Sequence, residues 1–223
     1  SNLGDYNYSR PSYVRHCAFH HGFAAAVGIL NSNSIPIEDN VVHRTLDYGL
    51  YLEGHSNIIR RNMLVYILWS SSILTWEAEF NGEYWGAIDA HLAQSVVIEE
   101  NFVSGVERLG LFYKAEACDH LNETVGIGMN NSIRANTIYS SLAGVVLLPD
   151  FFHQSLTCVK ISGFTVFKAM HWGIYYQGPH SVILDSNKLI DNFVSAFTYV
   201  IKPAPILHQV SNKFYTNKNS LIV

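Results

Sequence analysis

Ser95-Val96-Val97-Ile98-Glu99-Glu100-Asn101-Phe102-Val103 is the stretch of this sequence that decides the fold. A short apolar run leads to an asparagine, and apolar residues resume directly after it. The same order recurs at 34–42, 56–64, 132–138 and 181–190, with a glycine variant at 159–166 and a degenerate copy at 209–214. The turn residues of the copies are Asn40, Asn62, Asn101, Asn136, Gly163, Asn187 and Asn212.

The spacing of these turn residues predicts a solenoid. Asn40 and Asn62 are 22 residues apart, and the last three turn residues follow at intervals of 27, 24 and 25. The gaps of 39 residues before Asn101 and 35 residues after it each fit one coil plus an insertion. A repeat of this length made of short strands is typical of solenoids, and the Leu-x-x-Leu-x-Leu frame of leucine-rich repeats is absent.

Each copy supplies a short strand, a turn and another strand, which often follows a glycine. Coils stacked ~4.8 Å apart bury their apolar side chains in a continuous interior. Asparagine is expected in the turn because it tolerates a left-handed backbone and can form an amide ladder between coils, and Gly163 reaches that backbone without strain. We predict an all-β, right-handed parallel β-helix with coils of 22–27 residues. The alternative is an antiparallel sandwich of short strands.

The composition fits one elongated domain over 1–223, with loop insertions at about 69–92 and 107–129. The 48% of hydrophobic residues can fill a core, and this excludes disorder. A net charge of −4 without a basic stripe argues against a nucleic-acid partner. No apolar run reaches the ~18 residues that span a bilayer. Because the repeat pattern runs up to both ends of the sequence, we expect this chain to be a segment of a larger ectodomain.

The first insertion is the candidate interaction surface. It combines three tryptophans with carboxylates, namely Trp69, Trp76, Glu77, Glu79, Trp85 and Asp89. Aromatic faces beside carboxylates suit a groove that binds or cleaves carbohydrate, although large aromatics more often pack against their own protein. Cleavage of an acidic polymer is disfavoured because no Lys or Arg lies between Arg61 and Arg108.

We predict no catalytic residue, no metal site and no cofactor. The adjacent His20 and His21 would point to opposite faces of a strand, and no familiar metal-ligand spacing accompanies them. Acceptor sequons for N-glycosylation begin at Asn7, Asn122 and Asn130. Of the three cysteines, Cys118 and Cys158 form the favoured disulfide, because it would tie the second insertion to a neighbouring coil. Cys17 is expected to be a buried free thiol.

Several local motifs resemble the β-helix region of the fibrocystin and fibrocystin-L family, with fibrocystin preferred within the pair. The motifs are Tyr13-Val14-Arg15 with Cys17, Phe19-His20-His21-Gly22-Phe23, Ile37-Glu38-Asp39-Asn40, Asn62 through Trp69, Phe80-Asn81, Trp85 with Ala87-Ile88, Glu107-Arg108-Leu109-Gly110 and Cys118. They are scattered through the first half of the chain. Ser70-Ser71-Ser72 stands where this family would have a Pro-Gly turn.

The resemblance implies an extracellular segment of a large, single-pass, receptor-like glycoprotein. Such proteins are associated with the primary cilium and epithelial tubules, and fibrocystin loss with polycystic kidney and hepatic disease. It implies no known catalysis and a membrane anchor outside this segment. We therefore predict a non-enzymatic structural and interaction module, whose partners are other domains of its ectodomain and a protein or glycan ligand. The alternative is a glycan-binding or glycan-cleaving β-helix related to the cell-surface hyaluronidases.

Overall fold

The computed structural model describes residues 11–69, 85–115, 132–149, 158–178, 181–200, 207–210, 212–215 and 217–222. Within these ranges the secondary structure is all strand, and every strand pair is parallel. The prediction of an all-β parallel β-helix is confirmed. None of the described residues belongs to a helix that is long and apolar enough to cross a membrane.

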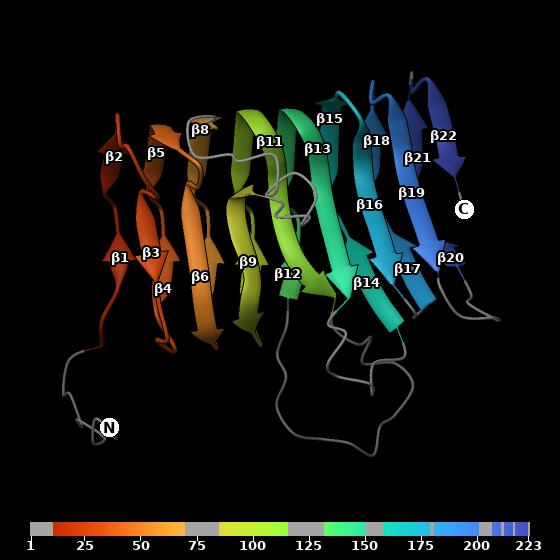
Figure 1. Ribbon diagram of the computed structural model, residues 1–223. Helices are drawn as coiled ribbons and strands as arrows, with labels where there is room; N and C mark the ends of the chain where they lie inside the picture. The colour runs from red at the N-terminus through yellow and green to blue at the C-terminus, as the bar shows by residue number, and fades with distance from the viewer. Residues whose placement is uncertain are drawn as a thin grey trace, which may run out of the picture.

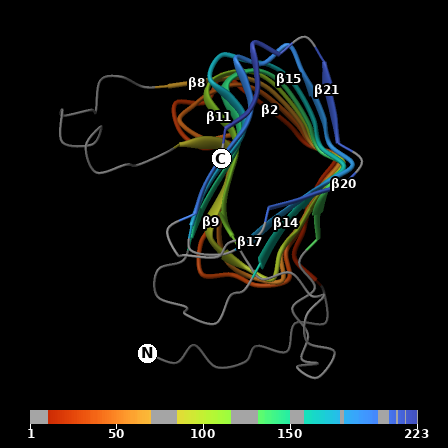
Figure 2. The same cartoon turned by 90° about the vertical axis from the view of Figure 1, so that its right-hand side faces the viewer.

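The strands form three walls around one interior, as the view along the solenoid shows (Figure 2). Face A is an eight-stranded sheet of β1 (Val14–Arg15), β4 (Pro36–Glu38), β7 (Ile58–Arg60), β10 (Val97–Glu99), β12 (Ser132–Arg134), β14 (Cys158–Ser162), β17 (Ser181–Asp185) and β20 (Leu207–Val210). Strands with the same place in successive coils lie side by side along the molecule (Figure 1).

Faces B and C belong to one sheet, because β11 (Phe102–Ala115) and β13 (Thr137–Pro149) run from one face to the other. Face B also contains β2 (Ala18–His20), β5 (Val41–Leu46), β8 (Met63–Leu68), β15 (Thr165–Ala169), β18 (Lys188–Ile190) and β21 (Lys213–Tyr215). Face C also contains β3 (Val27–Ile29), β6 (Leu50–His55), β9 (Gly86–Gln94), β16 (Trp172–Gly178), β19 (Val194–Val200) and β22 (Asn219–Ile222).

Apolar side chains in register from coil to coil fill the interior. On face A, Ile37, Ile59 and Ile98 are neighbours in one inward column, and each is 0% exposed. Face B contributes the column Val42, Leu64, Val103, Ile138, Val166 and Leu189, and face C contributes Leu50, Ile88, Leu111, Val145, Ile174 and Ala196. Burying each larger side chain stabilises the fold by about 1.5–3 kcal/mol.

The predicted asparagine ladder occupies the corner between faces A and B. At Asn101, the backbone N–H and Nδ2 both donate to Oδ1 of Asn136, at 3.0 and 2.9 Å, and Nδ2 also donates to the carbonyl of Ile59. Asn62 donates to Asn101 in the same way, with both distances 3.0 Å. The amides therefore join successive coils, as expected.

One of the two expected reasons for asparagine at this corner, its tolerance of a left-handed backbone, is wrong. The left-handed residue is the one before it: Asp39, Arg61, Glu100, Ala135, Gly163 and Ser186 have φ between 53° and 65°. Gly163 therefore fills the left-handed position, and the fully buried Phe164 takes the place of the asparagine in that coil. Asparagine is used here for its amide, which can both accept from and donate to the neighbouring coils.

Parts of the two predicted insertions belong to the solenoid. Residues 86–92 lie in β9, which pairs with β6 and β11, and residues 107–115 lie in β11. Their outward aromatic and charged side chains give them the composition of loops, which is why the bounds were placed too wide. The remainder, at 70–84 and 116–129, lies outside the described residues.

Charges alternate along one outward column of face A. Arg15, Glu38, Arg60, Glu99 and Arg134 are register neighbours, and each glutamate contacts arginines on both sides. The Glu99 side chain is 7% exposed and accepts from Arg60 at 2.9 Å, from Arg134 at 2.8 Å and from the hydroxyl of Ser132. Burial alone would raise the pKa of Glu99, but these hydrogen bonds outweigh it and lower the pKa.

We expect this column to make the fold acid-sensitive. A carboxyl group whose pKa is lower in the folded state stabilises the protein above its unfolded-state pKa, and loses that effect as the pH falls through the folded value. Glu99→Gln should lower the free energy of unfolding by about 1–2 kcal/mol at neutral pH and by less below pH ~4. Urea titrations at several pH values measure the free energy of unfolding of the wild type, of Glu99→Gln and of the control Glu100→Gln, which changes an exposed glutamate. An equal pH dependence of this free energy in the three proteins would contradict the prediction.

Candidate functional site

The outer side of face C carries a chain of aromatic and apolar side chains with a single carboxylate in it. The register neighbours of this outward column are Tyr51, Asp89, Phe112, Val146, Tyr175 and Phe197. Phe112 and Val146 form an apolar cluster with Leu109 and Ala143 that is separate from the interior core. Asp89 therefore lies in apolar surroundings on the outside of the solenoid.

Asp89 forms a close pair with His91, two residues further along β9. Its Oδ1 lies 2.5 Å from Nδ1 of the His91 ring and accepts from the His91 backbone N–H at 3.2 Å. Asp89 is 0% exposed, and its Oδ2 is buried with no hydrogen-bond partner among the residues that the structure describes. Burial raises the pKa of Asp89, and the hydrogen bond and charge of His91 offset this only in part.

Aromatic rings hold the histidine in place. The His91 ring stacks on Phe112 at a centroid distance of 5.0 Å and meets the ring of Tyr51 edge-on at 6.3 Å. The Tyr51 hydroxyl donates to Oε1 of Glu53 at 2.8 Å, and burial followed by the contact with Glu53 raises the pKa of Tyr51. The Trp85 ring stacks on Tyr48 at 5.3 Å, and Tyr48 in turn contacts Tyr51.

This arrangement orients one imidazole nitrogen. Asp89 engages Nδ1, so Nε2 lies on the opposite side of a ring whose side chain is 28% exposed. An imidazole held in this way by a buried carboxylate can accept a hydrogen bond or a proton. As the described residues are placed, no three His, Cys, Asp or Glu side chains among them converge so that they could hold a metal ion.

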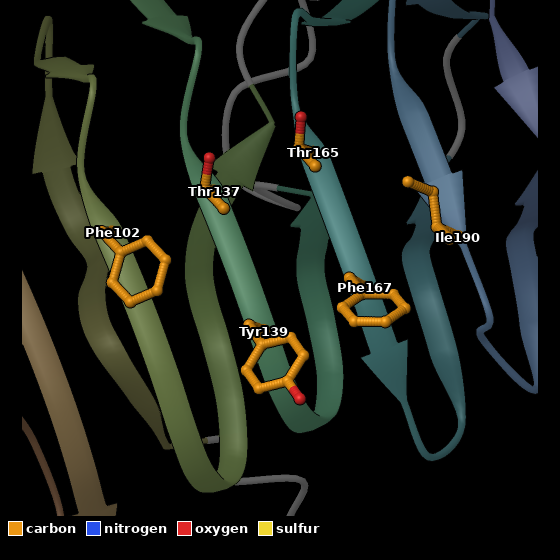
Figure 3. A pocket seen from close by; sticks show the side chains of 6 residues that line it. All are labelled: Phe102, Thr137, Tyr139, Thr165, Phe167 and Ile190. Carbon is orange, nitrogen blue, oxygen red and sulfur yellow. The ribbon is translucent and has the colours of Figure 1, made fainter.

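The outer side of face B carries a second candidate feature, an open apolar groove of about 420 Å³. Figure 3 shows its six lining side chains on neighbouring strands: Phe102, Thr137, Tyr139, Thr165, Phe167 and Ile190. The rings of Tyr139 and Phe167 stack at 5.0 Å. The apolar surface continues beyond the groove, since Phe102 shares an outward column with Met63 and Val41, which are both 44% exposed.

The structure brings together only part of the predicted interaction surface. Trp85 and Asp89 lie on the outer side of face C. Trp69 lies directly after β8, where the Arg108 guanidinium stacks 3.5 Å from the centroid of its ring and its backbone N–H donates to Oε2 of Glu107. Trp76, Glu77 and Glu79 lie outside the described residues. Sequence reasoning placed His91 in the same stretch as Asp89 but did not pair the two side chains, although residues two apart on a strand share a face and the Asp-x-His spacing was a usable signal.

The described residues do not test the predictions of the sequons and of the disulfide. The sequon residues Asn7, Asn122 and Asn130 and one half of the predicted disulfide, Cys118, lie outside the described residues, as does the side chain of Cys158. These predictions stay predictions.

Cys17 is a free thiol, as expected, but it is exposed rather than buried. It takes the asparagine position at the corner of the first described coil, where its N–H donates to Oδ1 of Asn40 at 3.0 Å. The corner breaks the strand alternation from which burial was inferred, and no described coil stacks on its outer side.

No family model matches this chain. The chain is similar over its whole length to fibrocystin-L of Homo sapiens and of Mus musculus, each at 30% identity. It is 27% identical to fibrocystin of Mus musculus over 96% of its length. It spans about 5% of the length of each of these relatives. The expected resemblance is confirmed, but these identities do not support the preference for fibrocystin within the pair.

Proposed function

We propose, because this chain belongs to the fibrocystin and fibrocystin-L family, that it is a non-enzymatic structural and interaction module of a receptor-like protein. In this proposal it forms a stiff, glycosylated part of an ectodomain at the plasma membrane and primary cilium. Parts of the protein outside this chain anchor it to the membrane. The partners are a protein ligand and other domains of the same ectodomain.

The observation that supports this function best is the exposed apolar surface on the outer side of face B. Val41, Met63 and Phe102 are each about 40% exposed and follow one another in register. An interior-facing column of a solenoid must be apolar, but an outward column has no such requirement. Extended apolar surface on the outside of a soluble module is typical of sites that contact another protein.

The parallel stacking makes this surface stiff. Each strand of face B between β2 and β21 is hydrogen-bonded to strands of the coils on either side, and the interior columns behind it are almost fully buried. A partner that docks here therefore meets side chains already fixed in position, which reduces the entropy lost on binding. The hydroxyls of Thr137 and Thr165, which are register neighbours and line the groove, can satisfy polar atoms of the partner.

We expect a double substitution, Phe102→Asp with Phe167→Asp, to weaken binding of the glycosylated chain to polarised epithelial cells by more than about tenfold. The control is Leu92→Asp, which places the same charge at an exposed apolar residue of face C. Flow cytometry measures binding before and after the cells are treated with protease or with glycosidases. Binding that resists protease, or that is unchanged by the face B substitutions, would overturn the proposal.

The pair of Asp89 and His91 favours a second candidate function, namely glycan binding or cleavage. Tyr51, Trp85 and His91 present aromatic faces beside two carboxyl groups, which suits sugar recognition. Incubation with hyaluronan and gel analysis of its chain length tests for cleavage. We expect no shortening. Shortening by the wild type that is lost in His91→Ala would replace the non-enzymatic function.

A further inference from the structure

A cluster of histidines lies at the corner between faces B and C in the first two described coils. The expectation that His20 and His21 point to opposite faces is wrong, because His21 has a left-handed backbone with φ of 54°. Strand alternation ends at that residue, and both imidazoles turn to the same side. Their Nδ1 atoms lie 3.2 Å apart, and both side chains are exposed.

This separation suits two ligands of one metal ion. Imidazole nitrogens bind Zn²⁺ at about 2.0–2.1 Å, and two nitrogens 3.2 Å apart at that distance subtend an angle of about 100° at the metal, close to tetrahedral. Without a metal, one Nδ1 must carry a proton that it donates to the other. When a metal ion binds, that imidazole would take the tautomer with its proton on Nε2, so that both Nδ1 atoms act as neutral ligands.

His43 supplies a third imidazole. It is the register neighbour of His20 in the next coil, and its ring meets that of His21 edge-on at a centroid distance of 5.8 Å. On its other side the His43 ring contacts Tyr66 at 5.8 Å, and its side chain is half-buried. The three imidazoles do not yet converge on one point, so His43 would have to rotate toward the pair on binding.

We propose that His20, His21 and His43 form a binding site for a divalent first-row transition metal, with water completing the coordination. Imidazole ligands select Zn²⁺, Cu²⁺ and Ni²⁺ over Ca²⁺ and Mg²⁺, which take oxygen ligands. The exposed Arg44 follows His43 at the same corner, and its positive charge keeps the site weaker than a structural zinc site. The site lies on face B at its corner with face C, and it shares no residue with the apolar groove or with the pair of Asp89 and His91.

Isothermal titration calorimetry of Zn²⁺ and of Cu²⁺ into the whole chain tests the site. All proteins carry Cys17→Ser, because the exposed thiol would bind the same metals. We expect about one equivalent of Zn²⁺ to bind, and Cu²⁺ to bind more tightly. His20→Ala and His21→Ala should each weaken binding by at least about tenfold, and His43→Ala by less. The matched control is His55→Ala, which removes another exposed histidine, one that contacts Ser56.

Thermal melts without metal show whether each variant is folded, and melts with Zn²⁺ give an independent measure of binding. Stabilisation by Zn²⁺ in the control that is absent in His20→Ala supports the site. Three results would overturn it: no binding at millimolar Zn²⁺, binding of equal strength in His20→Ala and the control, or equal binding of Ca²⁺.

Discussion

Gly144→Ala is expected to destabilise the protein by about 3 kcal/mol, which would lower its melting temperature by roughly 6–12 °C. Gly144 begins the face C part of β13, and a methyl group added there would lie 2.5 Å from Cγ1 of Val166 and closer still to the carbonyl oxygen of Gly173. Val166 is an inward side chain of face B, and the carbonyl of Gly173 belongs to the backbone. Neither group can move without disturbing the next coil.

The cost is steric and not conformational, since Gly144 does not have a positive φ. Gly49, Gly110 and Gly173 start the face C strands of other coils in the same way, and an added methyl at each would also meet a neighbouring coil at less than 3 Å. Inward side chains of face B fill the space just inside this corner. At these four glycines the interior therefore has no room for a side chain, whereas the coils that carry Ala87 and Ser195 at the same register position accommodate one.

Gly28→Ala provides the matched control for Gly144→Ala. Gly28 lies in β3 of the same face but is exposed, and a methyl group there would meet nothing within 4 Å. We expect its melting temperature to stay the same or to rise slightly, because alanine reduces the freedom of the unfolded chain. Calorimetric melts of the three proteins measure the difference. Equal melting temperatures for Gly144→Ala and Gly28→Ala would show that the corner can expand.

The fold was predictable because asparagines mark one corner of every described coil except two, in which Cys17 and Phe164 take that position. A ladder amide must face the amide of the next coil. The asparagine therefore stays at that corner even where the lengths of the coils differ. The residues with a left-handed backbone that precede the asparagines cannot be recognised in the sequence in the same way. Asp39, Arg61, Glu100 and Ala135 share this backbone conformation but no side-chain chemistry. That is why Gly163 was aligned one position away from its true place.

The candidate sites were less predictable because they depend on register across coils of unequal length. Met63, Phe102 and Thr137 become neighbours on face B although they are 39 and 35 residues apart in sequence. Only the lengths of the intervening segments decide that pairing. Asp89 and His91 are close in sequence, but they were hidden by placing residues 69–92 in a loop, where strand alternation carries no information.

Asn101→Leu is expected to destabilise the protein by about 3–5 kcal/mol. Asn101 is 1% exposed. Without its amide, the N–H and Nδ2 of Asn62 lose the Oδ1 that accepts from them at 3.0 Å, and the carbonyl of Ile59 loses a donor at 3.0 Å. Each buried polar group left without a partner costs about 1–3 kcal/mol. The backbone N–H of the new residue still donates to Asn136, so that link between coils survives.

The control is Asn212→Leu, at the half-buried last described rung of the same ladder, where water can replace the lost bonds to Asn187 and we expect less than half the effect. Urea unfolding of both variants measures the two free energies. Phe164 shows that a coil can stack without a corner amide, because its coil buries a large ring completely at the same position. Leucine is smaller than phenylalanine and offers Asn62 no acceptor. If Asn101→Leu nevertheless unfolds like the wild type, space filling and not amide pairing holds this corner together.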